Sequence, residues 1–243
     1  MSPQKTLRLD RLLANMGYGS RREIQFLVSE GLITLDGAEL TKADQHIPLS
    51  RDLSSRLMID GAAIDPIPGM VIMLHKPLGV TCSHKDVGPL VYDLLPERWR
   101  RREPAISTIG RLDKDTSGLL LLTDDGAFLH RVISPKHHIE KRYQVGLAQP
   151  LRGDETELFA AGTLMLEGEE KPLLPAALEV HSATTCALTI TEGRYHQVRR
   201  MFAAAGNHVS TLHRDKIGQL LLPSDLAAGD LRVLTPEALA QIL

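Results

Sequence analysis

The apolar positions of the first forty residues form two helical stripes. The first stripe recurs at helical spacing and consists of Leu9, Leu12, Leu13 and Met16. The second stripe consists of Ile24, Leu27 and Val28. Ser20 and Glu23 precede it with the spacing of a capping box, and Gly31 follows it. We therefore predict one helix that ends before Gly17 and Gly19, and a second helix between Ser20 and Gly31.

Beyond the second helix the pattern changes to short apolar runs that are typical of strands. Residues 32–35 and 38–40 flank Asp36 and Gly37, a pair that favours a tight hairpin turn. Further runs predict strands at residues 71–74, 119–122, 143–147, 177–180 and 186–191. An amphipathic helix that ends before Pro135 is predicted from Phe128, Leu129 and Val132. This mixture indicates an α+β fold with a mixed, mostly antiparallel central sheet.

A glycine- and proline-containing stretch divides the chain. Residues 61–69 begin and end with glycine and contain Pro66 and Pro68, as a linker would. We therefore expect a small N-terminal domain at residues 1–60, a linker at 61–69 and a larger domain at 70–243.

Composition places the chain among ordinary globular proteins. Its 243 residues are 43% hydrophobic, which is enough for a core in each domain. It has no apolar stretch near the roughly 18 residues that span a bilayer, and its first residues do not resemble a signal peptide. Cys82 and Cys186 lie far apart and form no CxxC motif, so neither a disulfide nor a cysteine zinc site is expected. We expect a cytoplasmic monomer that binds neither metal nor membrane.

Charge is distributed unevenly although the formal net charge is only −2. The first 22 residues carry a basic cluster that includes Arg8, Arg11, Arg21 and Arg22. Residues 98–102 read Arg-Trp-Arg-Arg-Arg. Such local basic surfaces can bind the phosphates of RNA, but a run of charges can also be a solvated face. For residues 98–102 both interpretations stay open.

Arg21 and Arg22 fall in the first turn of the second predicted helix. The helix dipole disfavours cations at that end by about 0.3–1 kcal/mol each, so folding does not require arginine there. Exposed amides and two arginines at a helix start suit a phosphate group, which favours contact with an RNA backbone.

Residues 110–126 read GRLDKDTSGLLLLTDDG and combine a polar loop with the buried-looking run at 119–122. Arg111 and Asp113 are two residues apart, so an extended backbone could direct both side chains toward one cleft. A neighbouring cation would keep the carboxylate ionised, as a nucleophile requires. Asp, Ser and Gly also form ordinary turns before strands, and the local pattern alone does not decide between these alternatives.

The same string resembles the aspartate motif of the pseudouridine synthases that act on ribosomal RNA. Matches follow in the order of that family at HKPLGVTCS (75–83), IEKRYQV (139–145) and EGRYHQVRRMF (192–202). Within the family, SPKHHIEKRYQV, LHRDKIGQLLL and the segment from 225 to 239 are most similar to the branch that acts on the small ribosomal subunit. The N-terminal helices and hairpin resemble an S4 RNA-binding domain.

This resemblance implies a reaction and a site. Asp113 would be the nucleophile, Tyr143 the active-site aromatic residue and Arg199 the ion-pair partner of Asp113. Uridine would be converted to pseudouridine in small-subunit rRNA without a cofactor. Asp113 would either add to the substrate or assist deprotonation of the ribose. Arg111 would fill the space left by a flipped nucleotide.

Further contacts with the RNA are expected from the N-terminal arginines and from Arg200, as a surface or phosphate contact. Without the resemblance, Arg199 and Arg200 would be surface residues of an apolar helix stripe. No HxxxH or HExxH spacing surrounds the histidines at 196 and 208, so a metal site is not expected there.

Two other classes of function are compatible with parts of the sequence. Asp113, Asp115 and Ser117 approximate the DxDx(T/S) signature of phosphotransfer enzymes of the haloacid dehalogenase kind, which depend on Mg²⁺. A non-catalytic RNA-binding or ribosome-assembly factor built on the S4-like domain is the other alternative. The preserved Asp113, Tyr143 and Arg199 argue against it.

Overall fold

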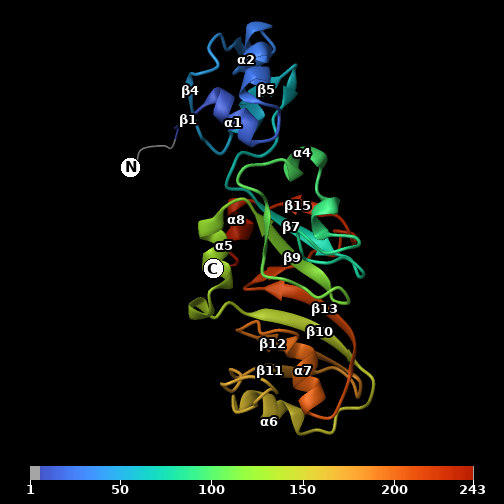
Figure 1. The fold of residues 1–243 in the computed structure, drawn as a ribbon. Coiled ribbons are helices and arrows are strands. Elements are labelled where there is room, and N and C mark those ends of the chain that lie inside the picture. Colours follow the sequence, from blue (N-terminus) through green and yellow to red (C-terminus); the bar gives the residue numbers. More distant parts are fainter. Residues whose placement is uncertain (1–5, 243) are drawn as a thin grey trace. The chain divides into compact units, whose positions relative to one another are not determined.

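The structure is a computed structural model that describes residues 6–242. The chain divides into two compact units, which we describe separately (Figure 1). The first unit contains residues 1–71 together with 95–107 and 123–125. The second contains residues 72–94, 108–122 and 126–243.

The first unit begins with two helices that pack on small sheets. Its elements are β1 (Thr6–Arg8), α1 (Leu9–Asn15), α2 (Arg21–Ser29), β2 (Ile33–Leu35), β3 (Ala38–Glu39), β4 (His46–Pro48), α3 (Leu53–Arg56), β5 (Leu57–Ile59), β6 (Ala62–Ala63) and α4 (Glu97–Arg100). A sheet has the strand order β3-β2-β5-β6, and β1 pairs with β4. The predicted apolar stripes form one core in which Leu9, Leu13 and Ile24 are fully buried. Both predicted helices and the first hairpin are confirmed.

Local sequence signals determine these elements. The side chain of Ser20 accepts a hydrogen bond from the backbone of Glu23 at 3.3 Å, and Glu23 accepts one from the backbone of Ser20 at 2.6 Å. This capping box satisfies two amides that the start of α2 leaves without helical partners. At the hairpin, Asp36 and Gly37 have φ values of 54° and 80°, as a primed turn requires.

The predicted linker is more ordered than its composition suggested. β5 and β6 form a hairpin across residues 60 and 61, so the sheet continues past the expected domain boundary. Arg102 and Asp124 then form a buried ion pair with an N–O distance of 3.0 Å. Arg102 also donates to the carbonyl of Pro66, and Asp124 accepts from the amide of Gly69 at 2.8 Å. Buried polar groups therefore fix the expected linker at 61–69 to residues far along the chain.

The second unit is built on a nine-stranded sheet with the main order β11-β12-β10-β13-β9-β7-β15. Its strands are β7 (Val71–Lys76), β8 (Ser107–Ile109), β9 (Ser117–Thr123), β10 (Lys141–Leu147), β11 (Ala177–Val180), β12 (Thr185–Ile190), β13 (Val209–Ile217), β14 (Leu220–Leu221) and β15 (Leu231–Val233). β13 pairs antiparallel with β10 but parallel with β9. The predicted α+β fold with a mixed, mostly antiparallel sheet is confirmed.

Short helices accompany this sheet. They are η1 (Val91–Leu94), α5 (Gly126–Ile133), η2 (Pro135–His137), α6 (Glu155–Ala160), α7 (Gln197–Ala204) and α8 (Pro236–Leu239). Figure 1 shows α6 and α7 beside β10, β11 and β12, and α5 near β9. The ring of Phe159 in α6 packs edge to face against the ring of Phe202 in α7. The ring centroids are 5.2 Å apart, and both rings are buried. This contact joins the two helices over the sheet.

The centre of the sheet was not predicted. β13 reads VSTLHRDKI and alternates imperfectly, because His213 and Arg214 lie among its apolar positions. It nevertheless pairs with β10 along its length and brings Arg214 opposite Tyr143. On its other side Arg214 lies opposite Gly118 of β9. The sheet thus places a buried cation between the predicted tyrosine strand and the strand that follows the predicted nucleophile.

Candidate active site

Asp113 lies in a tight turn that hydrogen bonds hold in place. The amide of Thr116 donates to the carbonyl of Asp113 at 3.1 Å, which closes the turn. The ammonium group of Lys76 is fully buried and donates to the carbonyl of Thr116 at 2.9 Å. Burial lowers the pKa of Lys76, and the charges of Asp113 and Asp115 oppose that shift. The ammonium group of Lys76, at the end of β7, therefore holds the loop in position.

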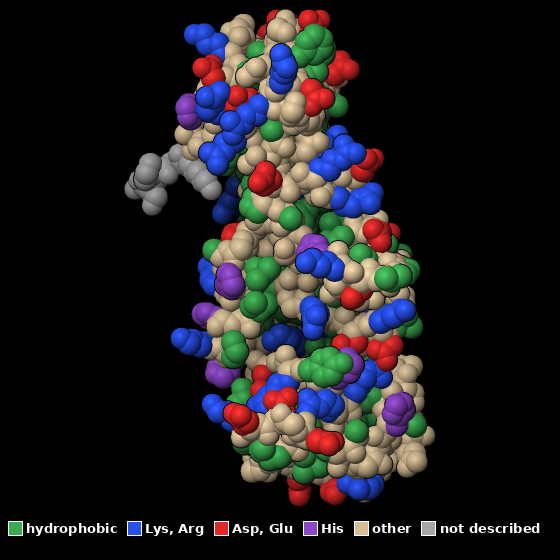
Figure 2. Space-filling view, viewed as in Figure 1, with side chains coloured by type: hydrophobic (Ala, Val, Ile, Leu, Met, Phe, Trp, Pro, Cys, Tyr) green, Lys and Arg blue, Asp and Glu red, His purple; other side chains and the backbone are tan. Residues whose placement is uncertain are grey.

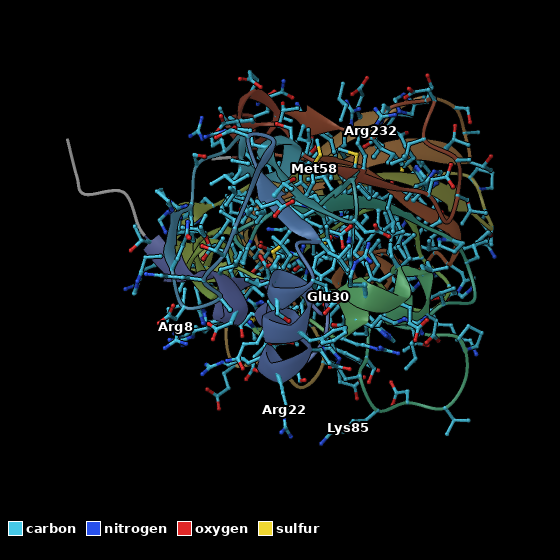
Figure 3. The ribbon with its side chains drawn as sticks, turned by 90° about the horizontal axis from the view of Figure 1, so that it is seen from above. Arg8, Arg22, Glu30, Met58, Lys85 and Arg232 are labelled. Carbon is cyan, nitrogen blue, oxygen red and sulfur yellow. The ribbon has the colours of Figure 1, made fainter. Side chains whose placement is uncertain are left out.

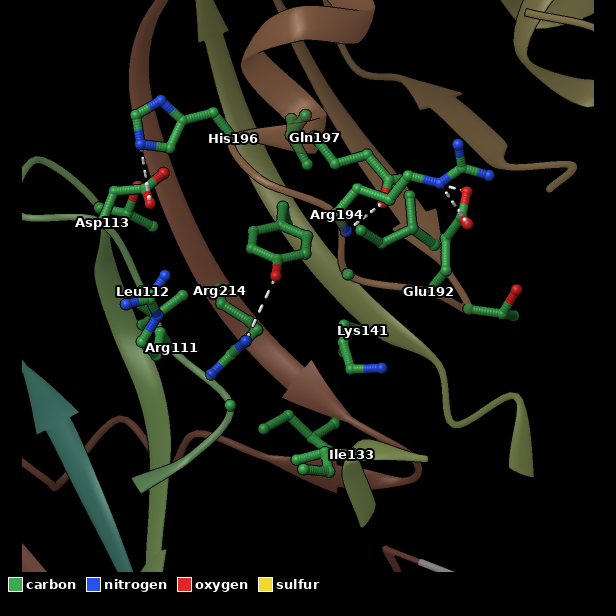
Figure 4. A pocket seen from close by; sticks show the side chains of 18 of the residues that line it. Arg111, Leu112, Asp113, Ile133, Lys141, Glu192, Arg194, His196, Gln197 and Arg214 are labelled. Atoms are coloured by element: carbon green, nitrogen blue, oxygen red, sulfur yellow. Dashed lines mark hydrogen bonds and ion pairs between the residues drawn. The ribbon is translucent and has the colours of Figure 1, made fainter. Parts of the chain in front are cut away.

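A pocket opens beside this loop (Figure 4). Asp113 and Arg111 line it from the loop, Tyr143 and Lys141 from β10, and Arg214 from β13. The structure thus brings together Asp113, Tyr143 and Arg111, as the sequence predicted. Apolar walls complete the pocket and include Leu112, Ile133, Val198, Leu212 and Ile217. A polar floor within apolar walls is the usual construction of a small-ligand site.

Arg214 is the cation at the floor of the pocket. Its residue is 3% exposed, and its Nε donates to the carbonyl of Leu119 at 2.8 Å. Its Nη1 donates to the hydroxyl oxygen of Tyr143 at 3.3 Å. Nη2 is buried and has no hydrogen-bond partner within the described residues. Leaving a buried guanidinium donor unused costs free energy, so Nη2 is suited to donate a hydrogen bond to an oxygen of a bound substrate.

Lys141 is the second cation of the pocket. Its ammonium group donates to the carbonyl of Ile139 at 2.8 Å. Burial, together with the nearby charge of Arg214, lowers its pKa to about 8. Two cations in one pocket repel each other, and an electron-rich ligand between them would relieve that repulsion.

His196 contacts the predicted nucleophile directly. Its Nε2 lies 3.3 Å from Oδ1 of Asp113 (Figure 4). It precedes α7 in the left-handed region with φ 47°. No metal-binding spacing surrounds this residue in the sequence, and its contact with Asp113 was not predicted. Its position within EGRYHQVRRMF was the available signal.

Arg199 does not form the predicted ion pair with Asp113. Its guanidinium instead pairs with the carboxylate of Asp115 at 2.9 Å and donates to the carbonyl of Asp115 at 3.0 Å. It also donates to the carbonyl of Val209 at 3.0 Å. Arg199 is in the first turn of α7, which faces the far end of the loop and the start of β13. The prediction was wrong about its partner, and Arg199 instead joins the nucleophile loop to two other elements.

Arg200 is hydrogen-bonded within the protein. Its Nη1 donates to Glu169 at 2.9 Å and to the carbonyl of Tyr195 at 3.2 Å, and its Nη2 donates to the carbonyl of Glu167. Arg194 also pairs with Glu169, at 3.2 Å. These acceptors satisfy the guanidinium and offset its charge, and the expected surface or phosphate contact of Arg200 stays a prediction.

The N-terminal arginines fall into two groups. Arg8 makes two hydrogen bonds to the buried Asp10, at 2.7 and 3.1 Å, and these hold the pKa of Asp10 below its usual value. Arg11, Arg21 and Arg22 are exposed and make no ion pair with the residues between 6 and 242. Figure 3 shows the side chain of Arg22 pointing away from the protein. The contribution of Arg8 to an anion site is therefore offset by Asp10, whereas the other three remain available.

The basic run at 98–102 is mostly paired within the protein. Arg98 donates to Asp65 at 2.6 Å and stacks over Tyr18, and Arg102 is the buried partner of Asp124. Arg101 pairs with Glu97. On the face in Figure 2, lysine and arginine side chains are interspersed with aspartate and glutamate. Much of this run therefore has a structural role.

The structure also bears on metals and membranes. Within residues 6–242, no cluster of three or more His, Cys, Asp or Glu side chains is arranged to hold a metal ion. None of the helices in this range is both long and apolar enough to cross a membrane. Cys82 and Cys186 are buried and unpaired with each other.

The sequence matches two family models. The model described as RNA pseudouridylate synthase covers residues 70–204, and the model of the S4 domain covers residues 7–50. The chain therefore belongs to the RNA pseudouridylate synthase family and carries an S4 domain at its N-terminus. The phosphotransfer interpretation was wrong, because the DxDx(T/S)-like string belongs to the aspartate loop of this family.

Full-length relatives agree with this assignment. The chain is 44% identical over 237 residues to the ribosomal small subunit pseudouridine synthase A of Vibrio cholerae, covering 97% of this chain and 99% of the relative. It is 41% identical over 241 residues to the protein of the same name in Escherichia coli, covering 98% and 100%. A crystal structure of a pseudouridylate synthase matches with a TM-score of 0.68 at 37% identity, covering 98% of this chain and 100% of that one.

Proposed function

We propose that this protein converts a uridine of small-subunit ribosomal RNA to pseudouridine. The observation that carries the proposal is the position of Asp113, whose carboxylate opens on a pocket shared with Tyr143 and Arg214. The names of the two relatives supply the substrate class. The pocket, of about 210 Å³, is smaller than the roughly 300–1,000 Å³ typical of drug-sized ligand sites, which suits a single flipped base.

The reaction is an isomerisation, so the site must detach and rejoin one base. The bond between N1 and C1′ breaks, a bond between C5 and C1′ forms, and the proton on C5 leaves while N1 gains one. Asp113 acts at the ribose as the catalytic carboxylate. Tyr143 offers an aromatic face to the base and places its hydroxyl beside Arg214. All atoms come from the substrate and water, so no cofactor is required.

The buried Arg214 and the half-buried Lys141 assist by binding oxygen atoms. Arg214 has one buried donor unused, and Lys141 carries a proton below a pH of about 8. Both would donate to the carbonyl oxygens of uracil or to the neighbouring phosphate. Arg111 lies exposed at the rim, where it would take the space that the flipped nucleotide leaves. Arg199 would act as a positioning residue, because it joins Asp115 to the start of β13.

The S4 domain would bind the RNA backbone through Arg11, Arg21 and Arg22. Phosphate contacts of this kind add affinity but do not select a sequence. One RNA can contact separate basic surfaces at the same time. One copy of the chain would therefore supply both RNA binding and catalysis. We further propose that the protein acts as a monomer in the cytoplasm, where its rRNA substrate is made.

Release of tritium from C5 of labelled uridine tests this function. Unmodified small-subunit rRNA is incubated with the protein in the presence of a metal chelator, and the Asp113→Asn variant is the control. We expect release by the wild type and none by Asp113→Asn, with RNA affinity preserved. Binding without release by the wild type would instead identify a non-catalytic RNA-binding factor. Equal release by both proteins would remove Asp113 from the mechanism.

A further inference from the structure

A pair of stacked rings lies at the rim of the active site. The rings of Tyr195 and His196 have centroids 3.9 Å apart and are inclined by 16°, so they are nearly parallel. His196 lines the pocket and touches Asp113 at 3.3 Å. Tyr195 is not among the lining residues and is 67% exposed. The pair therefore extends from the catalytic carboxylate outward, with an aromatic face open to solvent.

The backbone that carries these rings is held firmly. His196 has a left-handed conformation directly before α7, where few non-glycine residues are found without support. Arg200 donates to the carbonyl of Tyr195 at 3.2 Å and is itself paired with Glu169. Arg194, on the other side, donates to Glu192 at 3.0 Å. An exposed tyrosine on so well-braced a turn is pre-organised to bind, because little freedom is lost when a ligand covers it.

The local charges indicate what kind of group would bind there. Arg194 and Arg200, the cations beside the rings, are already paired with glutamates, so the surface offers little attraction to a phosphate. A flat aromatic face whose neighbouring Arg194 and Arg200 are already paired favours a nucleobase, which binds through stacking.

We propose that Tyr195 is a stacking platform for the base next to the target uridine in the RNA. The inference rests on the proposed function, because a uridine ribose at Asp113 places the adjoining nucleotide beside His196 and Tyr195. The platform would hold the neighbour in place while the target base turns inside the pocket. Tyr195 would thus contribute to RNA binding, and the chemistry would remain with Asp113.

The test uses a synthetic RNA that spans the uridine modified by the wild-type protein, with the base on either side intact or removed in turn. Release of tritium from C5 gives kcat and KM for wild type and Tyr195→Ala on each RNA. We expect Tyr195→Ala to raise KM for the intact RNA by about 5-fold to 150-fold, the usual worth of one stacked base, with little change in kcat. Removing the stacked base should raise the KM of the wild type by a similar factor. On the RNA that lacks this base, Tyr195→Ala should raise KM almost no further, because both changes remove the same interaction.

Two further variants separate stacking from a structural role. Tyr195→Phe keeps the ring and should resemble the wild type. Tyr195→Leu still covers His196 but lacks the flat face, so it should behave like Tyr195→Ala. Val180→Ala, at an exposed position of β11, is the surface control and should leave KM unchanged.

The outcomes distinguish the inference from the function beneath it. Absence of release by the wild type would overturn the proposed function and this inference with it. Tritium release by the wild type together with an unchanged KM for Tyr195→Ala would overturn only the platform. The same would follow if the increases in KM caused by Tyr195→Ala and by removal of a neighbouring base multiplied, whichever base is removed. Rescue by leucine would show that Tyr195 merely covers His196.

Discussion

Arg214 lies buried in the pocket beside the hydroxyl of Tyr143, whereas Arg199 pairs with Asp115 in the loop that carries Asp113. Arg199 stands in a recognisable motif, and its type and spacing suggested a partner for Asp113. Arg214 stands in a strand with irregular alternation, and nothing local marks it as buried. Only the pairing of β13 with β10 and β9 brings it to the pocket, opposite Tyr143 and Gly118. Residue types near the chemistry were predictable, but the position of Arg214 in the pocket depended on long-range register.

Lys141 should give the reaction an alkaline limit. Burial and the charge of Arg214 lower its pKa to about 8, so above that pH it loses the proton that it would donate to the substrate. We expect kcat/KM to fall above pH 8 in the wild type. Lys141→Arg stays protonated, so its decline should move to higher pH. Both profiles are obtained from tritium release, measured in the pre-steady state or the steady state. The pH range is roughly 6.5 to 10, at a constant ionic strength.

The same shift predicts the direction of a stability change. The pKa of Lys141 falls from 10.5 when unfolded to about 8 when folded, so the unfolded chain binds more protons between these values. Stability relative to Lys141→Met should therefore rise as pH increases through this window. Lys216→Arg, on a half-buried side chain that donates to Gln219, should change neither profile. Identical alkaline limbs in the wild type and Lys141→Arg would exclude Lys141 as the titrating group.

At the scale of elements, the parallel contact between β9 and β13 depends on Gly118. This residue has φ 111°, and an added Cβ would lie 2.2 Å from the carbonyl oxygen of Arg214. Gly118→Ala would force the strands apart at the point where Arg214 enters the pocket. We expect a loss of about 2–6 kcal/mol in the free energy of unfolding, the sum of roughly 1–3 for overpacking and 1–3 for the backbone conformation. Urea unfolding measures it.

Gly126→Ala is the matched control for this substitution. Gly126 begins α5, has no positive φ, and has nothing within 4 Å of an added Cβ. It should be neutral or more stable by up to about 1 kcal/mol, because alanine restricts the unfolded chain. An unchanged stability of Gly118→Ala would mean that the two strands can separate without cost, and Arg214 would then not be held in its observed position.

The elements that could be predicted from the sequence differ physically from those that could not. The capping box of α2 and the Asp36-Gly37 turn are local signals, and both were confirmed. The apolar run of β9 was equally clear, because its leucines are buried on both faces. By contrast, β13 carries polar side chains that serve the site, and β6 is only two residues long. Propensity is weakest where function or distant pairing determines the structure.

At the scale of the whole molecule, the chain combines an RNA-binding unit with a catalytic unit, and their duties can be tested separately. Arg21 and Arg22 lie at the positive end of the α2 dipole, where cations are unfavourable for folding. Their exposure and lack of ion pairs within residues 6–242 are consistent with service to a ligand. Asp113, by contrast, lies in the other unit.

Replacing both arginines should therefore weaken RNA binding without harming chemistry. For Arg21→Ala combined with Arg22→Ala, the slope of log K against log salt concentration should become shallower by about 1.4–1.8, since each phosphate contact contributes roughly 0.7–0.9. The rate at saturating RNA should not change. Arg56→Ala is the matched control, because Arg56 is already paired with Asp36 and Asp52 on the same unit. Filter binding over a series of salt concentrations gives the slopes, and equal slopes for the double variant and the control would reject these arginines as phosphate contacts.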